Sequence, residues 1–248
     1  MCLCSILQKL NRTETNLITV EDPIEMNIKG INQVQVNSEI GLTFANVLRS
    51  VLRQDPDIVM IGEIRDNETA KIAVRASITG HLVLSTIHTN NSLNTIERLL
   101  DMEVERYLLA SALEGIISQK LARKLCDKCK KPHILTDDEK KYIERVTKLT
   151  GVEYDLEKEY NTYEPVGCDY CNNTGYYERI GLFEVLCIDD YLRYMISEGF
   201  SIIDIKKYAI ENTDYKPLVC DGISKVLSGL TTCLLYTSDA ADEARSVD

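Results

Sequence analysis

The 248-residue sequence lacks the features that mark secreted, membrane-spanning and general nucleic-acid-binding proteins. No apolar run approaches the roughly 20 residues that a membrane-spanning helix requires, and no signal peptide is visible at the N-terminus. Basic residues are in deficit, because 28 Lys and Arg face 39 Asp and Glu, a net charge of -11. Phosphate backbones need clustered cations, so this balance argues against general nucleic-acid binding. We expect a cytosolic chain of one large or two small domains.

The most organised stretch is a predicted strand–helix–strand unit in the first half of the chain. Ile58–Ile61 predicts a buried strand, Asn67–Ser77 predicts a helix with one apolar face, and Leu82–Leu84 predicts a second strand. A unit of this kind implies a parallel sheet. Ligands of such sheets bind at the carboxyl ends of the strands, where this sequence places Glu63 and His88. The pattern therefore predicts an α/β fold with a site at that edge.

A second acidic strand end lies upstream. Leu17–Val20 predicts a strand that ends in Glu21 and Asp22, and Pro23 then stops the ladder because it has no N–H donor. Carboxylates at a strand end can hold a divalent cation through water or orient an attacking water molecule. Taken alone, this pair favours a solvated acidic turn. The presence of Glu63 at the end of a neighbouring strand shifts the interpretation toward a site.

Residues 41–54 predict a helix on which Arg49 and Arg53 share one face, because they are four positions apart. These arginines could reach a phosphate or a neighbouring subunit. A solvated basic face explains the spacing equally well.

Four of the nine cysteines form two C-x-x-C pairs, a spacing that suits a tetrahedral structural zinc site. The pairs are Cys126 with Cys129 and Cys168 with Cys171. A redox pair and unrelated buried cysteines are the alternatives, and the occurrence of two pairs in a cytosolic chain favours zinc. We expect a long helix at 105–124 before the first pair and a helix at 137–149 between the pairs.

Three segments resemble the signature boxes of the secretion ATPases that serve type II secretion and type IV pilus assembly. They are Ile18–Glu25 (ITVEDPIE), Leu52–Asp66 (LRQDPDIVMIGEIRD) and Thr79–Asn90 (TGHLVLSTIHTN). They are similar to the acidic, Walker B and histidine boxes of that family. The tetracysteine pattern and the segment Arg179–Val185 (RIGLFEV) are similar to its assembly and secretion branch. The resemblance extends from Ser5 to about Thr232.

This resemblance implies a RecA-like P-loop NTPase core that forms a homo-hexamer with ATP between subunits. Glu63 matches the glutamate that holds Mg²⁺ through water, and Glu21 matches the one that polarises the attacking water. His88 matches a residue at the γ-phosphate, whereas His81 fits either such a role or a structural contact after Gly80. Phosphoryl transfer needs little more than these contributions. Further candidates for nucleotide contact are Asp22, Arg49 and Arg53.

The chain departs from the family at the phosphate loop, because nothing in it matches G-x-x-x-x-G-K-[ST]. Ser5–Asn11 resembles the helix that follows that loop in relatives, so we expect an N-terminally truncated core that hydrolyses ATP negligibly by itself. The alternative is a non-catalytic, zinc-stabilised module that docks on a secretion or pilus assembly complex. A nucleic-acid translocase of similar fold is disfavoured by the acidic charge.

The expected organisation has four parts. They are a truncated ATPase core at 1–125, a zinc-binding subdomain at 126–175, a C-terminal helical subdomain at 176–232 and a non-native tail at 233–248. By resemblance, the intact protein is a motor at the cytoplasmic face of the inner membrane, with ATP, Mg²⁺ and Zn²⁺ as cofactors. Its expected partner is an inner-membrane platform protein, and no nucleic acid is expected.

Overall fold

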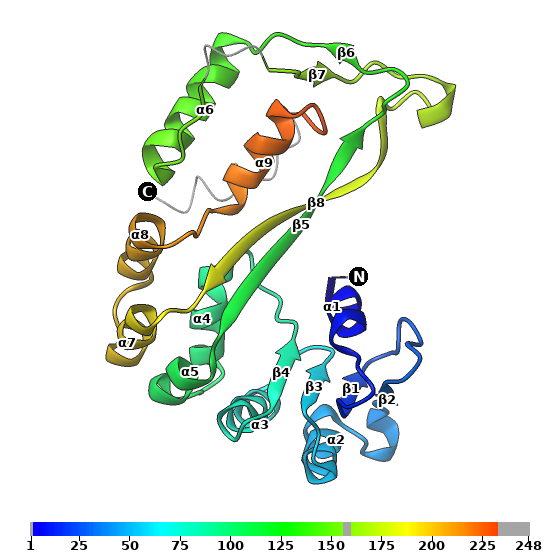
Figure 1. Cartoon of the computed structure of the whole chain (residues 1–248), viewed down its shortest axis with the longest axis vertical. Coiled ribbons are helices and arrows are strands. Elements are labelled where there is room, and N and C mark those ends of the chain that lie inside the picture. Colours follow the sequence, from blue (N-terminus) through cyan, green and yellow to red (C-terminus); the bar gives the residue numbers. More distant parts are fainter. Residues whose placement is uncertain (1, 156–159, 233–248) are drawn as a thin grey trace. The chain divides into compact units, whose positions relative to one another are not determined.

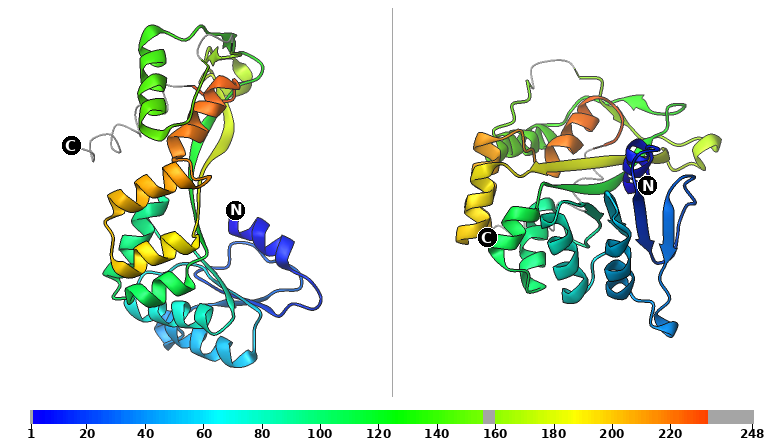
Figure 2. Two further views of the ribbon diagram at one scale, coloured as in Figure 1. Left: turned by 60° about the vertical axis from the view of Figure 1, so that its left-hand side comes forward. Right: turned by 60° about the horizontal axis from the view of Figure 1, so that its bottom comes forward.

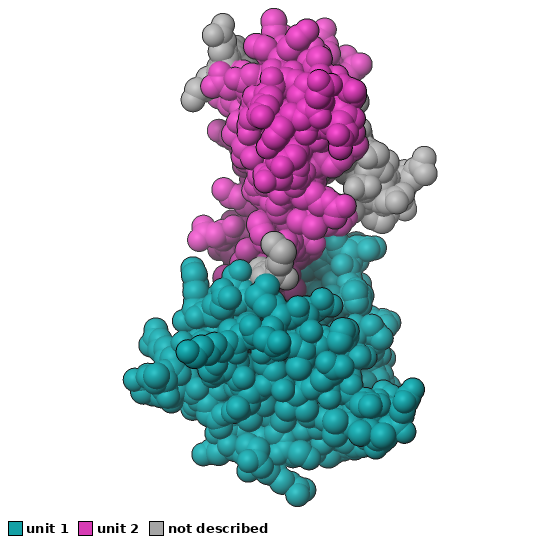
Figure 3. Space-filling model, turned by 90° about the vertical axis from the view of Figure 1, so that its right-hand side faces the viewer, with its two compact units in different colours: residues 1–114, 188–205 teal, residues 115–187, 206–248 magenta. Residues whose placement is uncertain are grey.

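The computed structural model describes residues 2–155 and 160–232, so the predicted non-native tail lies outside the described residues (Figure 1). The chain divides into two compact units, each of which combines two segments (Figure 3). Unit 1 comprises residues 1–114 and 188–205, and unit 2 comprises residues 115–187 and 206–248. No helix in the described ranges is both long enough and apolar enough to cross a membrane.

Unit 1 is built on a four-stranded parallel sheet, as the strand–helix–strand pattern predicts. In spatial order its strands are β2 (Asn32–Gln35), β1 (Leu17–Glu21), β3 (Ile58–Ile61) and β4 (Leu82–Ser85). Every residue of β1 and β3 is buried, which agrees with their inner positions. The register places Val20 beside Ile61, and Ile61 beside Ser85, so the carboxyl ends of these three strands align.

The described residues of unit 1 also form six α-helices. They are α1 (Cys2–Leu10), α2 (Phe44–Val51), α3 (Asn67–Ile78), α4 (Ser92–Asp101), α5 (Arg106–Ala112) and α7 (Asp190–Glu198). Leu7 of α1 packs against Leu17, Ile58 and Met60 and so covers one face of the sheet. The helix predicted at 41–54 begins only at Phe44, because Gly41 adopts a left-handed φ of 76° and the Thr43 side chain caps α2.

Unit 2 is built on a long antiparallel ribbon of β5 (Gly115–Leu125) and β8 (Tyr176–Cys187) (Figure 2). A second, short ribbon pairs β6 (Lys131–Pro132) with β7 (Tyr163–Glu164). The helix predicted at 137–149 is confirmed as α6 (Asp137–Thr150), and it packs against α9 (Leu218–Leu227). Another helix, α8 (Ile202–Asn212), spans the unit boundary at residue 205.

The helix predicted at 105–124 is wrong. Helix α5 ends at Ala112, and β5 begins at Gly115. Along β5, more buried positions alternate with exposed ones, and this period of two is the signature of a strand. The same pairing makes residues 176–187 a strand inside the region expected to be helical. Because β5 and β8 pair along most of their length, both strands lie in unit 2.

Helix α9 contacts β8 through hydrogen bonds as well as through apolar packing. The buried Glu184 carboxylate accepts a hydrogen bond of 2.9 Å from the Leu218 N–H in the first turn of α9. Asp221 accepts a hydrogen bond of 2.8 Å from the Phe183 N–H, and Lys225 Nζ donates to the Gly181 carbonyl at 2.7 Å. Because Pro217 offers no side-chain cap, Glu184 supplies the cap from a different element.

Replacing Glu184 by Ala is expected to destabilise unit 2 by about 1–3 kcal/mol, because a buried N–H donor at the start of α9 would lose its acceptor. Glu184→Gln keeps an acceptor oxygen and should cost less. Urea denaturation together with amide exchange in α9 measures both effects, with the exposed Glu144→Ala on α6 as the matched control. If Glu184→Ala and Glu144→Ala lowered the free energy of unfolding equally, the cap on α9 would make no contribution to stability.

Candidate functional site: an acidic sheet edge and a four-thiol cluster

Glu21 ends β1 with a buried and oriented carboxylate. Its Oε1 accepts hydrogen bonds of 2.6 Å from the Thr19 hydroxyl and 2.9 Å from Gln33 Nε2. Thr19 is two residues earlier on the same strand, so its side chain emerges on the same face, and Gln33 comes from the neighbouring strand β2. Two neighbouring strands therefore fix the direction of one carboxylate.

Glu63 follows β3 after a tight junction at Gly62. The Gly62 N–H donates to the Val20 carbonyl at 2.7 Å, and a Cβ at this position would lie 3.2 Å from that carbonyl oxygen. From the other side, the Thr86 hydroxyl donates to the Gly62 carbonyl at 2.6 Å. Glycine is thus suited to the close approach of β1 and β3 at the point where Glu63 leaves the sheet.

The Glu63 side chain is only 11% exposed and has two basic neighbours at its Oε2 atom. Arg65 Nε lies 2.6 Å away and His88 Nε2 lies 3.4 Å away. The structure therefore brings Glu63 and His88 together at the carboxyl edge of the sheet. Arg65 was missed by the reasoning from sequence, although it stands only two residues after Glu63.

The other predicted nucleotide residues lie elsewhere. Asp22 is exposed just beyond β1. His81 precedes β4, and its Nδ1 lies 3.0 Å from the Ala76 carbonyl. It therefore sits at the amino end of a four-residue strand whose length, about 13 Å, separates it from the edge that carries His88. Arg49 pairs with Glu68 of α3, and Arg53 is exposed in a short 3₁₀ turn.

Within the described residues, no contact joins His81, Arg49 or Arg53 to Glu63. The local contacts of His81 are those of a helix terminus, since the Thr79 hydroxyl also lies 3.2 Å from its Nδ1. In this chain the edge of the sheet is formed by Glu21, Glu63 and His88, with Arg65 beside them.

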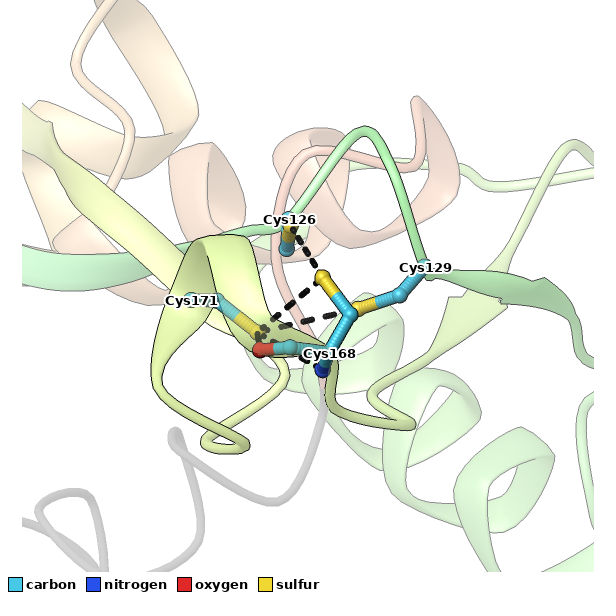
Figure 4. A group of neighbouring side chains, drawn as sticks. All are labelled: Cys126, Cys129, Cys168 and Cys171. Carbon is cyan, nitrogen blue, oxygen red and sulfur yellow. Dashed lines mark hydrogen bonds between the residues drawn. The ribbon is translucent and has the colours of Figure 1, made fainter.

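The four cysteines of the two C-x-x-C pairs converge on one point (Figure 4). Their sulfur atoms all lie within 4.8 Å of one another, with separations of 4.0 Å for Cys126–Cys168 and 3.8 Å for both Cys129–Cys171 and Cys168–Cys171. Tetrahedral thiolates around a metal at about 2.3 Å would lie about 3.8 Å apart, whereas a disulfide needs about 2.05 Å. The group can therefore hold a metal ion.

Backbone N–H groups prepare one of these sulfurs for the thiolate form. Burial acts to raise the pKa of Cys171, but N–H donors of Cys168 and Gly175, each 3.3 Å away, and neighbouring thiols lower that pKa to about 6. Burial raises the pKa of Cys129 to about 11, aided by the other three thiols. Without a metal, Cys171 therefore ionises more easily than Cys129.

We expect a divalent ion to protect all four clustered thiols from alkylation while the exposed Cys187 still reacts. After chelation at pH 7.5, Cys171 should be modified before Cys129, because only its pKa lies below the working pH. Mass spectrometry of iodoacetamide-treated protein reads each site, and Cys187 is the internal control. Protection of fewer than four clustered thiols would contradict a shared ion.

Comparisons with known proteins identify relatives that match most of this chain. The type II secretion system protein E of Dickeya dadantii (strain 3937) is 45% identical over 230 residues, which are 93% of this chain and 44% of that protein. The type IV pilus assembly ATPase PilB of Myxococcus xanthus (strain DK1622) is 47% identical over 93% of this chain and 39% of that protein. The chain thus spans less than half the length of these relatives.

Solved structures agree at the level of the fold. The crystal structure of the pilus retraction motor PilT with bound ADP has a TM-score of 0.67 and 27% identity, over 96% of this chain and 56% of that chain. The Legionella pneumophila ATPase DotB, at 22% identity and a TM-score of 0.65 over 97% of this chain and 56% of that one, shares the fold. The model of the family "Type II/IV secretion system protein" matches residues 1–244, and this chain belongs to that family.

Proposed function

We propose that the intact protein is an ATP-hydrolysing motor subunit that powers type II protein secretion or the assembly of a type IV pilus or pseudopilus. The observation that carries the proposal is the buried Glu63 at the carboxyl edge of a parallel sheet, with His88 3.4 Å away and the oriented Glu21 on the neighbouring strand. The relatives named a type II secretion protein and a pilus assembly ATPase support it. The core would be RecA-like.

Each residue of the edge fits one requirement of phosphoryl transfer. Glu63 would hold Mg²⁺ through water, Glu21 would accept a hydrogen bond from the attacking water, and His88 would contact the γ-phosphate region. Bound Mg²⁺ would supply charge compensation for the transferring group. Arg65 Nε, 2.6 Å from Oε2 of Glu63, would balance the charge at this edge before the nucleotide binds. His81, at the other end of β4, would act structurally.

The motor would act as a homo-hexamer at the cytoplasmic face of the inner membrane. Its partner would be the platform protein of the secretion or pilus machinery, and nucleic acid would not be a substrate. The net charge of -11 supports the exclusion of nucleic acid, and the names of the relatives support a role in secretion or pilus assembly. The hexamer, the membrane face and the platform partner follow from the family resemblance. In a hexamer the nucleotide would lie between subunits. Arg49 and Arg53 could contact its phosphates there, although in the described part of one subunit neither contacts Glu63.

We expect the 248-residue chain to hydrolyse ATP negligibly alone, because it holds no G-x-x-x-x-G-K-[ST] sequence to cradle the phosphates. A chimera tests the site itself, with residues 1–232 replacing the matched residues of the Dickeya dadantii protein. Its Mg²⁺-dependent phosphate release should fall at least about 100-fold in Glu63→Gln and in Glu21→Gln, a loss typical of a charge that acts at the transition state.

The matched control is Glu103→Gln, which changes an exposed carboxylate that pairs with Lys71. Turnover by this variant should stay near that of the parent chimera. A Glu63→Gln chimera that keeps parental turnover would refute the proposal. Mg²⁺-dependent hydrolysis by the 248-residue chain alone would refute only the expectation that this chain is inactive.

We also propose that the four-thiol cluster binds one structural Zn²⁺. The donor set, the spacing of the sulfurs and the burial of Cys126 and Cys171 fit a closed tetrahedral site. The ion would join residues near 126 to residues near 171 and close a loop that contains β6, α6 and β7.

One zinc per chain is expected by elemental analysis, and its loss by chelation should lower the stability of unit 2. Because protons compete with the metal for thiolates, affinity should fall as the pH is lowered. Cys171→Ser should reduce zinc to well below one per chain, whereas Cys220→Ser, a change of a buried cysteine outside the cluster, should retain it. Full zinc occupancy in Cys171→Ser would contradict the assignment.

A further inference from the structure

The end of the β5–β8 ribbon next to the cysteine cluster is unusually basic for this chain. Between residues 120 and 131 there are six cationic residues and one carboxylate, a net of +5 in a protein whose overall charge is -11. Two of the lysines form ion pairs. Lys124 lies 3.5 Å from Asp127 and 3.6 Å from Glu178, and Lys130 lies 2.7 Å from Asp127.

Two arginines at this end face each other without a counter-charge. Arg123 of β5 is the direct cross-strand partner of Arg179 of β8, and both side chains are exposed on the same face of the ribbon. Within the described parts of the chain, neither forms an ion pair. Like charges directly opposite each other destabilise a sheet, so their placement costs stability unless something anionic lies between them.

Contacts with neighbouring residues order Arg123 of this pair. The Arg123 guanidinium carbon lies 4.5 Å from the centre of the Tyr176 ring, and its carbonyl accepts a hydrogen bond of 2.9 Å from the Thr231 hydroxyl. The Tyr176 hydroxyl in turn lies 3.0 Å from that of Thr232. Ordering Arg123 in advance reduces the entropy that binding would otherwise cost.

The backbone is distorted at the same place. The register of the ribbon shifts between Arg123 and Leu125, and Glu178, directly before Arg179, has a φ of 68°. A non-glycine residue in the left-handed region is uncommon, and bulges of this kind often re-aim side chains at binding sites. Here Glu178 forms an ion pair with Lys124, and among the described residues it forms none with either arginine.

Two exposed apolar side chains follow the arginine pair along the same face of the ribbon. The Phe183 ring lies over Gly181, where a Cβ would be only 2.8 Å from two ring carbons, so glycine at this position makes room for the ring. Phe183 is 40% exposed, and Leu121, opposite Gly181, is 56% exposed. A ligand held at the arginines could therefore rest a planar or apolar group on these side chains.

We propose that Arg123 and Arg179 form a binding site for a phosphate ester on the exposed face of the ribbon, separate from the carboxylate edge of unit 1. Planar guanidinium forks match phosphate oxygens, and two of them facing one another can share one phosphate group. The phosphate relieves the repulsion between the arginines, while Phe183 and Leu121 contact the organic part of the ligand. Nucleotides and anionic lipid headgroups both have this chemistry.

The first test is calorimetric titration of the zinc-loaded 248-residue chain with inorganic pyrophosphate in the absence of Mg²⁺. Arg123→Gln and Arg179→Gln should each weaken binding at least tenfold, and Arg179→Lys should keep part of it. The control Arg145→Gln removes the same charge from the exposed face of α6 and should bind like the parent. Glu63→Gln should also bind like the parent, which separates this site from the proposed ATPase function.

Thermal unfolding distinguishes a binding role from a structural one. Without ligand, Arg179→Gln should unfold at the same temperature as the parent or at a higher one, because it removes a repulsive pair. Pyrophosphate should raise the unfolding temperature of the parent but not of this variant. The proposal is overturned if pyrophosphate shows no saturable binding, if Arg145→Gln weakens it as much as Arg179→Gln, or if Arg179→Gln is simply unstable.

Two further probes identify the source of the phosphate. Adenosine monophosphate that binds more tightly than pyrophosphate, with the gain lost in Phe183→Ala, would indicate a nucleotide. Co-sedimentation with phosphatidylglycerol vesicles but not with phosphatidylcholine vesicles, lost in Arg123→Gln, would indicate a lipid headgroup. Either result supports the site. Phosphatidylglycerol binding that survives the loss of both arginines would overturn the site as the source of that binding.

Discussion

The antiparallel pairing of β5 with β8 fixes most of what unit 2 can do. Strand β5 runs into Cys126, and β8 begins shortly after Cys171, so the ladder that pairs Leu125 with Tyr176 brings both C-x-x-C turns to one end of the ribbon (Figure 4). The same ladder sets Arg123 against Arg179 and presents Glu184 to α9. A single strand register therefore brings the four thiols together, sets Arg123 opposite Arg179 and positions the Glu184 side chain that caps α9.

A two-stranded ribbon is marginally stable by itself in water, so this register must be reinforced from outside. On one face, Leu182 packs against Leu218 of α9, and Glu184 and Asp221 add polar links between strand and helix. At one end, the four sulfurs of the two turns converge, and the proposed metal would join them. The opposite face keeps Leu121 and Phe183 exposed, so it adds little packing to the ribbon.

The sequence shows the parallel sheet and its acidic edge because both depend on local signals. Runs of buried β-branched residues mark β1 and β3, and Glu63 simply follows where β3 ends. The ribbon was missed for a physical reason. Leu121, Ala122, Arg123 and Lys124 all have high helix propensity, and only the pairing with β8, more than 50 residues away, makes them a strand. Register between distant segments leaves no local trace.

The need for three-dimensional information also explains which individual site residues could be placed correctly from the sequence. His81 and His88 fall in one sequence box, yet they lie at opposite ends of β4, because a strand carries successive residues steadily away from its start. The cysteine pairs could be predicted, since C-x-x-C spacing is itself a local turn signal. Arg65, by contrast, has no motif of its own and is found only through its 2.6 Å contact with Glu63.

Carboxylates and thiols serve two different physical purposes in this chain. At the sheet edge, the Glu21 and Glu63 carboxylates are buried, and their partners are polar or basic side chains. In unit 2 the buried cluster around Ile143, Ile223 and Leu227 is small. A metal cross-link between turns some 40 residues apart can add stability that such a core cannot supply, and it does so without depending on nucleotide. Under these proposals, nucleotide chemistry would belong to the sheet edge of unit 1, and the metal cross-link would stabilise unit 2.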